Sequence, residues 1–236
     1  MITPTLQELI FIDIETVSQF SKYDEISEDF KKIWQKKMRY ESERSQLPES
    51  DLYQQKAAIF AEFGKIICIS VGMWSHKELR LKIKSFFGND EKTILAEFID
   101  FCQKLKSTKY LFCGHNIKEF DIPYICRRML IQDFKIPKIL DFQNKKPWDV
   151  QMIDTLQFWK FGDYKHYVSL DTLTTIFGVP SPKEEIDGSM VGDVYWKENN
   201  LSKIVAYCQR DVEAVAQLFL KLNQQPPLFP DQIKII

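Results

Sequence analysis

Two carboxylates near the start of the sequence have a spacing that suits metal ligands. Asp13 and Glu15 stand two residues apart, at the end of an apolar run over Leu9–Ile14 that predicts a short buried strand. Side chains two apart on a strand lie on the same face, so two carboxylates converge. Hard oxygen donors suit Mg²⁺ or Mn²⁺, and a cation between them relieves the repulsion of the like charges. This pair is the first candidate metal site.

A third carboxylate, Asp121, follows a strand end later in the chain. The segment Gly114–Pro123 leads from the end of a strand through a turn into a helix, whose first turn accepts Pro123. Asp121 then lies near the helix N-cap. That role is worth about 1 kcal/mol on its own, and it is compatible with metal binding. His115 in the same turn has no cysteine or histidine at zinc spacing, which favours a packed or hydrogen-bonded turn residue.

A tyrosine and an aspartate share one face of a long amphipathic helix near the end of the sequence. Tyr207 and Asp211 lie four residues apart, so a phenol and a carboxylate point together. Tyr167 and Asp171 have the same spacing, but Ser169 between them predicts an N-cap, so these two side chains need not share a face. We therefore place Tyr207 and Asp211 in the candidate site and interpret Asp171 as a first-turn helix residue.

The elements that position these residues follow an α/β order. After the first strand, the region 25–63 has amphipathic helical spacing and predicts two inserted helices. Two strands, a helix, a fourth strand, a second helix and the long helix follow. Their predicted bounds are Lys65–Trp74, Leu79–Phe87, a helix from Asn89 or Asp90 to Lys106, Tyr110–Cys113, a helix from Pro123, and Leu201–Leu222. This order predicts an α/β sheet layered with helices.

The composition sets bounds on the class of protein. The 236 residues are 44% hydrophobic, enough for one globular domain with a sizeable core. The net charge of −1 predicts that any nucleic acid binds through local contacts and not through a global field. The five scattered cysteines, none in a CxxC arrangement, argue against a disulfide framework and a zinc site, and predict reduced intracellular thiols. There is no signal-like start and no apolar run of about 18 residues, so we expect a cytoplasmic protein.

Taken in chain order, the three motifs resemble those of the DEDDy branch of the DnaQ-like 3′–5′ exonucleases. That branch has Asp-x-Glu, Asn-x-x-x-(Phe/Tyr)-Asp and Tyr-x-x-x-Asp motifs. Its histidine counterpart has a histidine five residues before the last aspartate, where this chain has Ala206. The sequence is more closely similar to the predicted exonucleases related to the proofreading domain of family-B DNA polymerases. The segments that carry this similarity are Phe11–Thr16, Glu62–Ile66, and Lys183 with Ile186–Ser189 and Val191.

The resemblance implies a ribonuclease-H-like α/β fold, with a mixed β-sheet flanked by α-helices, and two Mg²⁺ or Mn²⁺ ions. By the resemblance, Asp13 bridges both ions. Glu15 and Asp211 complete the site that activates the attacking water, and Asp121 serves the leaving-group ion. Tyr207 aligns the nucleophile. Contacts to the terminal nucleotide are implied for Thr16, Asn116 and Phe120, the last of which either stacks or simply packs.

The expected activity is metal-dependent hydrolysis of single-stranded DNA or RNA from its 3′ end. We expect residues 1–222 to form one exonuclease domain, with a helical insert at about residues 24–63 and a C-terminal tail over 223–236. Two alternatives stay open. One is a non-catalytic nucleic-acid-binding module on the same fold, which the presence of all four carboxylates and the tyrosine disfavours. The other is an RNA-trimming exoribonuclease, since a 2′-hydroxyl is recognised by local contacts.

The tail and several basic pairs suggest contacts with partners. Gln225–Phe229 resembles the Gln-x-x-Leu-Phe peptides by which replication proteins bind sliding clamps, although a proline-containing apolar end more often packs on its own domain. Four basic pairs either meet phosphates or are only solvated surface. They are Lys31-Lys32, Lys36-Lys37, Arg127-Arg128 and Lys145-Lys146.

Overall fold

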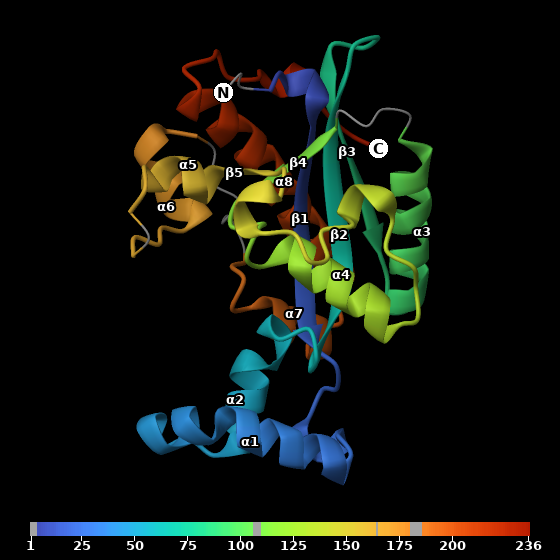
Figure 1. Cartoon of the computed structure of the whole chain (residues 1–236), viewed down its shortest axis with the longest axis vertical. Coiled ribbons are helices and arrows are strands. Elements are labelled where there is room, and N and C mark those ends of the chain that lie inside the picture. The colour runs from blue at the N-terminus through green and yellow to red at the C-terminus, as the bar shows by residue number, and fades with distance from the viewer. Residues whose placement is uncertain (1–3, 106–109, 164, 180–185) are drawn as a thin grey trace.

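A mixed β-sheet forms the centre of the molecule (Figure 1). The computed structural model describes residues 4–105, 110–163, 165–179 and 186–236, so Lys183 of the sequence motif lies outside the described residues. Within these ranges six strands pair in the order β5-β4-β1-β2-β3-β6. The first three strands form an antiparallel meander, and the other pairings are parallel. The strands are β1 Leu9–Ser18, β2 Gly64–Ser75, β3 Arg80–Phe87, β4 Leu111–Gly114, β5 Ile153–Asp154 and β6 Ile233–Ile235.

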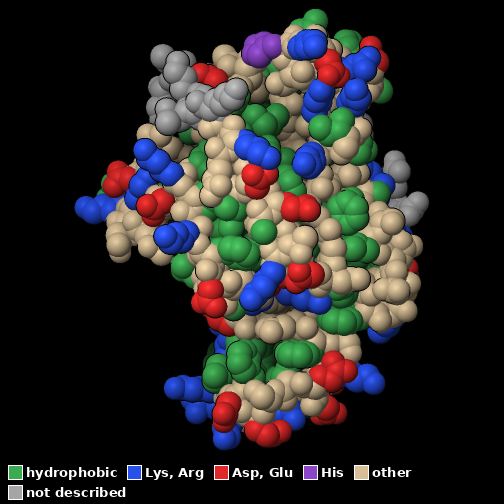
Figure 2. Space-filling view, turned by 90° about the vertical axis from the view of Figure 1, so that its right-hand side faces the viewer, with side chains coloured by type: hydrophobic (Ala, Val, Ile, Leu, Met, Phe, Trp, Pro, Cys, Tyr) green, Lys and Arg blue, Asp and Glu red, His purple; other side chains and the backbone are tan. Residues whose placement is uncertain are grey.

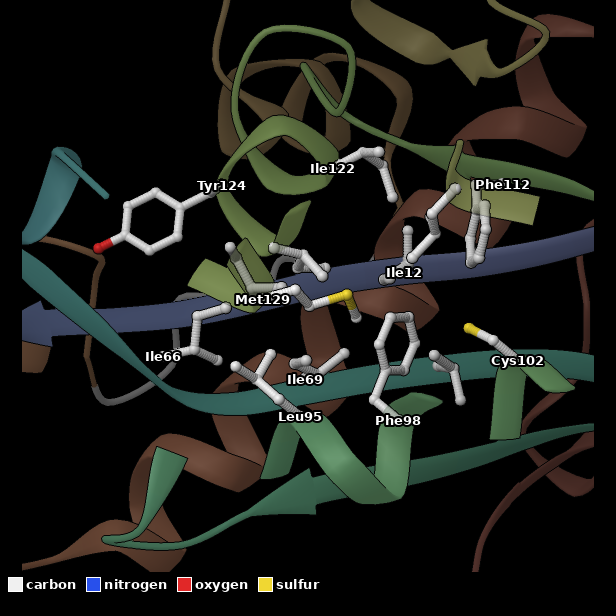
Figure 3. Packing of buried hydrophobic residues seen from close by; sticks show 14 of the residues in the cluster. Ile12, Ile66, Ile69, Leu95, Phe98, Cys102, Phe112, Ile122, Tyr124 and Met129 are labelled. Carbon is white, nitrogen blue, oxygen red and sulfur yellow. The ribbon is translucent and has the colours of Figure 1, made fainter. Parts of the chain in front are cut away.

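Helices cover both faces of the sheet, because the central strand alternates apolar side chains toward each face. Ile10, Ile12 and Ile14 join a core with helices α3 and α4 (Figure 3), while Leu9 and Phe11 pack with α8 on the other face. The helices are α1 Glu28–Ser45, α2 Glu49–Lys56, α3 Glu91–Lys104, α4 Asp121–Ile131, α5 Thr155–Lys160, α6 Leu170–Phe177, α7 Val191–Trp196 and α8 Leu201–Leu222. No helix in the described ranges is long and apolar enough to span a membrane.

The predicted helices and strands are present, with three differences. The first strand continues to Ser18, because its far end pairs with β2 as far as Gly64. Helix α4 begins at Asp121 instead of Pro123, and Phe120 occupies its N-cap. The sequence did not predict β5 and β6, because strands of two and three residues carry no detectable alternation.

The predicted helical insert forms a lobe at one end of the molecule (Figure 1). Helices α1 and α2 pack around Trp34, whose ring centroid lies 4.9 Å from that of Phe63 and 5.4 Å from that of Tyr53. Its indole N–H donates to the carbonyl of Glu49 at 2.9 Å, so the buried polar atom is paired. Acidic and basic side chains are interspersed on the face in Figure 2, which fits the near-zero net charge.

The C-terminal segment packs back on the sheet, in line with the second interpretation of the tail. The side-chain amide of Gln217 donates to the carbonyl of Leu228 at 2.8 Å and accepts from its N–H at 2.9 Å. The Leu228 side chain joins the core beneath α8, and β6 adds to the sheet beside β3. The leucine of the Gln225–Phe229 pattern is therefore occupied within its own domain.

A buried ion pair connects the elements on the α3–α4 face. Arg128 donates from Nε to Glu91 Oε1 at 2.8 Å and from Nη2 to Oε2 at 2.5 Å, and both side chains are almost fully buried. Arg128 also donates to the carbonyl of Ala61, while Glu91 accepts from the N–H of Ile66 at 2.8 Å. The pair thus links α3 and α4 to the start of β2. Arg128 is therefore buried in the ion pair and is not available to phosphates, whereas Arg127 is exposed.

Removal of one partner of this pair should destabilise the fold. Arg128→Met leaves the buried Glu91 carboxylate uncompensated, which we expect to cost about 3–5 kcal/mol of unfolding free energy. Arg127→Met, one residue away on the exposed side, should change stability by no more than about 0.5 kcal/mol. Urea unfolding of both variants measures the difference. Equal stability of the two variants would contradict a structural role for the pair.

Candidate active site

The candidate site lies at the edge of β1 that β4 leaves uncovered. Among the described residues, β4 pairs with β1 only from Leu9 to Phe11. Beyond that point the Asp121 side chain takes the place of a neighbouring strand, since its Oδ1 accepts from the N–H of Ile14 at 3.2 Å. The turn before α4 therefore brings Asp121 to the strand that carries Asp13 and Glu15. Ends of parallel strands in α/β sheets are common places for ligand sites.

Asp13 and Glu15 share the β1 face that packs against α8, as the alternation predicts. Antiparallel pairing with β2 fixes them opposite Ser70 and Cys68, respectively. Potential ligand atoms of Asp13, Glu15 and Cys208 lie within 4.8 Å of one another. Cys208 Sγ also lies 3.4 Å from Asp13 Oδ2 and 3.5 Å from the Asp13 carbonyl, in positions to donate its proton.

Cys208 is the member of this cluster that the sequence analysis did not single out. It was interpreted only as part of the apolar side of α8, and it is indeed fully buried. Burial raises the pKa of its thiol well above the usual range, as does a hydrogen bond with Cys68, so the thiol keeps its proton at neutral pH. Its place between Tyr207 and Asp211 is the one sequence signal that indicated proximity to the site.

Tyr207 and Asp211 lie one turn apart on α8, and both are buried at the same site. The Tyr207 hydroxyl is hydrogen-bonded to Asp211. Burial raises the pKa of Tyr207 far above its ordinary value, and the negative charges of Asp211, Glu15 and Asp13 raise this pKa further. The phenol is therefore protonated at neutral pH.

The clustered carboxylates are strongly destabilised as anions. Burial raises the pKa of Asp13 well above its ordinary value, and repulsion from Asp211, Asp121 and Glu15 adds to this effect. Burial and Asp211 likewise raise the pKa of Glu15 well above the ordinary value. The pKa of Asp121 rises to about 7, chiefly through burial, against the lowering effect of two backbone N–H groups. A cation among these groups would offset both the repulsion and the loss of hydration.

The three predicted nucleotide contacts have different surroundings. Thr16 Oγ1 donates to the carbonyl of Ala58 at 2.9 Å, at the junction with the helical insert. Asn116 has a left-handed backbone with φ of 65°, and its buried Oδ1 has no hydrogen-bond partner among the described atoms. The Phe120 ring packs against Tyr124 with a centroid distance of 5.4 Å, which favours the packing interpretation of this residue.

A buried aspartate that the sequence analysis missed supports the turn before α4. Asp154 accepts hydrogen bonds from the backbone N–H groups of Asn116 at 2.9 Å and Lys118 at 3.2 Å, and it caps α5. Its carboxylate thus accepts from three backbone donors, with both oxygen atoms engaged. Nothing in the sequence around β5 distinguishes it from an ordinary surface aspartate.

His115 and the second tyrosine-aspartate pair lie as the sequence predicts. The two ring nitrogens of His115 are hydrogen-bonded to the hydroxyl of Thr155 and the carbonyl of Val168, each at 2.9 Å. Burial lowers the pKa of His115, so it is a neutral, packed turn residue. The Ser169 side chain caps α6, and Tyr167 before it is 66% exposed.

Comparison with solved structures shows the same fold in a much larger protein. The structure of the family B DNA polymerase from the hyperthermophilic archaeon Pyrobaculum calidifontis aligns with a TM-score of 0.57 and 14% sequence identity. The alignment covers 91% of this chain but only 24% of the polymerase chain. The mixed sheet with helices on both faces is consistent with the predicted ribonuclease-H-like α/β fold.

A sequence comparison with models of protein families identifies the family of this chain. No curated protein sequence matches the chain significantly. The family model described as predicted 3′-5′ exonuclease related to the exonuclease domain of PolB matches residues 59–227, which include Asp121, Tyr207 and Asp211. Because this match covers most of the chain, the chain belongs to the family of predicted 3′–5′ exonucleases related to the exonuclease domain of PolB.

Proposed function

We propose that this protein is a metal-dependent 3′–5′ exonuclease that hydrolyses the terminal phosphodiester bond of a nucleic acid strand. The observation that carries the proposal is geometric. Carboxylates from β1, the start of α4 and the middle of α8 converge, mostly buried, at the uncovered edge of β1. We further propose one exonuclease domain over residues 1–222, with the helical insert as part of it and residues 223–236 as a tail that packs on the domain.

The donor set fits two Mg²⁺ or Mn²⁺ ions held by Asp13, Glu15, Asp121 and Asp211. The carboxylate oxygen atoms are hard donors of the kind these ions prefer, and the Cys208 thiol, 3.4 Å from Asp13 Oδ2, is placed to orient the Asp13 carboxylate by hydrogen bonding. When bound, two such ions stabilise both the attacking and the leaving oxygen of an in-line displacement.

The remaining residues bind the substrate and orient the water. A protonated phenol is no general base at neutral pH, so Tyr207 positions the attacking water by hydrogen bonding. The unpaired Oδ1 of Asn116 supports a role as an acceptor for the terminal nucleotide, and Thr16 lies one residue after Glu15 on the same strand. Family membership and the polymerase fold support the substrate class.

Activity should require a divalent ion and the β1 and α8 carboxylates. With Mg²⁺ or Mn²⁺, an end-labelled single strand of DNA or RNA should be shortened one nucleotide at a time, and excess chelator should stop the reaction. Asp13→Asn and Asp211→Asn should each reduce turnover by at least about a thousandfold, because each removes charge that holds the ions. Asp171→Asn on α6 is the matched control and should retain turnover. Gel analysis of time courses measures these rates.

The direction of cleavage is tested with the same assay. A strand blocked at its 3′ terminus should survive, whereas one blocked at its 5′ terminus should be shortened. Cuts within a circular single strand would refute exonuclease action. Binding without cleavage of DNA or RNA would favour a non-catalytic module, and cleavage of RNA alone would identify an exoribonuclease.

Tyr207→Phe should separate the orienting role of the hydroxyl from the packing of the ring. We expect single-turnover cleavage to fall by roughly ten- to a thousandfold, the range of oriented hydrogen-bond effects. Tyr167→Phe has the same spacing to an aspartate but lies at the exposed approach to α6, and it should cleave at the normal rate. A normal Tyr207→Phe beside a defective Tyr167→Phe would mean that the α6 pair belongs to the active site.

Without divalent ions, stability should fall as the pH rises. The pKa of Asp121 is about 7 in the folded chain, against an ordinary value of 3.8, so the folded state binds more protons than the unfolded state between these values. We therefore expect the Tm in chelator to drop by several degrees from about pH 5 to about pH 8, since each pKa unit is worth about 1.4 kcal/mol.

The matched comparison for this trend is Asp121→Asn, which lacks the titrating group. This variant should show a smaller drop than the unmodified protein, and Mg²⁺ should raise the Tm of the unmodified protein most at the higher pH. Scanning calorimetry or fluorescence measures both. A Tm in chelator that rises with pH in the unmodified protein, with the same slope in Asp121→Asn, would contradict the raised pKa.

A further inference from the structure

A cleft lies between the end of β1, the helical insert and α7. It has a volume of about 860 Å³, and its floor includes Thr16 and Ser18 at the end of β1. Gln54 and Gln55 of α2 line one wall, and Gly192 and Trp196 of α7 line the other. Figure 1 shows α2 and α7 near the same end of β1. In the proposed function Thr16 contacts the terminal nucleotide, and Thr16 also lines this cleft, so the cleft lies beside the expected position of the strand end.

One wall presents an aromatic ring in a fixed position. The Trp196 indole N–H donates to Ser18 Oγ at 3.1 Å, and Lys65 Nζ lies 4.8 Å from the centroid of the Trp196 ring. The neighbouring Tyr195 ring packs edge-on with a centroid distance of 4.8 Å. An aromatic ring held in this way and partly open to a polar cleft is suited to stack on an unpaired base.

Two glycines on this wall leave space that the packing of the chain does not require. A Cβ added at Gly188 or Gly192 would meet no described atom within 4 Å, and neither residue has a left-handed φ. Gly64 and Gly114 differ, since a Cβ there would lie 2.2 Å from the Tyr124 hydroxyl and 1.9 Å from an Ile117 side-chain atom. Glycine is unfavourable within a helix, and Gly192 lies inside α7. The open space at Gly192 therefore favours close approach of a ligand to the backbone.

The charges of the cleft suit a short single strand. Its charged lining residues are Lys22, Lys197 and Asp193, and Asp193 accepts from Lys197 at 2.9 Å. The remaining lining is neutral and mixes serine, threonine and glutamine side chains with apolar ones. A duplex carries about one charge per 1.7 Å of its axis and binds mainly through many cations. A cleft with one net positive charge and a stacking ring matches unpaired bases better.

We propose that this cleft binds the single-stranded segment of nucleic acid that precedes the terminal nucleotide. Trp196 stacks on a base, the backbone passes close to Gly192, and Gln55 of the helical insert contacts the strand from the other wall. The inference rests on the proposed function for the orientation of the strand. Binding itself needs no turnover, so the two can be tested separately.

Fluorescence anisotropy with a labelled oligonucleotide of about ten nucleotides tests the cleft, in chelator to prevent cleavage. Gly192→Leu fills the open space and should weaken binding of single-stranded DNA and RNA at least about tenfold, while leucine, as the better helix former, should leave the Tm equal or higher. The matched control is Gly88→Leu, at a glycine with similar free space outside the cleft. It should bind normally.

A second pair of variants tests the α2 wall. Gln55→Glu adds a negative charge beside the strand and should weaken binding several-fold, more so at low salt. Gln103→Glu, exposed on α3 and away from the cleft, should have no effect. Single-strand binding should exceed that of a duplex of the same length.

The outcomes separate the cleft from the chemistry. If Gly192→Leu binds weakly and the unmodified protein degrades no substrate in Mg²⁺ or Mn²⁺, the binding role of the cleft is supported and the proposed function is wrong. If both Gly192→Leu and Gln55→Glu bind the oligonucleotide normally, the proposed binding role of the cleft is wrong, whatever the nuclease assay shows. No binding by the unmodified protein, or equal binding of duplex and single strand, would also overturn it.

Discussion

Buried carboxylates of like charge repel one another, and the scaffold has to hold several of them together around Asp13. The position of β1 makes this feasible. It lies in the middle of the sheet, pairs with β2 from Ile10 to Ser18, and is packed by helices on both faces. A strand held this firmly presents Asp13 and Glu15 in fixed positions. The carboxylates cannot move apart by a shift of the backbone, so a bound cation would be the way to relieve their repulsion.

The supporting interactions lie away from the carboxylates themselves. On one face, the Arg128–Glu91 pair fixes α4 relative to the start of β2, and α4 carries Asp121 at its first residue. Asp154 holds the turn that precedes α4 by accepting two of its backbone N–H groups. Buried charges that are paired or hydrogen-bonded thus support the elements that carry the mutually repelling carboxylates.

Local periodicity accounts for what the sequence could predict. The alternation along β1 placed Asp13 and Glu15 on one face, and the apolar spacing of α8 gave its observed bounds. The contact of Asp121 with the Ile14 N–H, the thiol of Cys208 beside Asp13 and the hydrogen bonds of Gln217 with Leu228 could not be predicted in this way. Each depends on elements more than ten residues apart, whose approach is set by packing and not by local pattern. The cleft beside α7 could not be predicted from the sequence for the same reason.

The site is assembled from segments that are distant in the chain, with Asp13 and Cys208 separated by 195 residues. The complete set of candidate carboxylates extends from Asp13 to Asp211. During synthesis, a chain in which α8 has not yet been made lacks both Tyr207 and Asp211. Contacts between residues this far apart in the sequence form late in folding. A partly synthesised chain would therefore hold only part of the candidate site, and its side chains come together only in the finished fold.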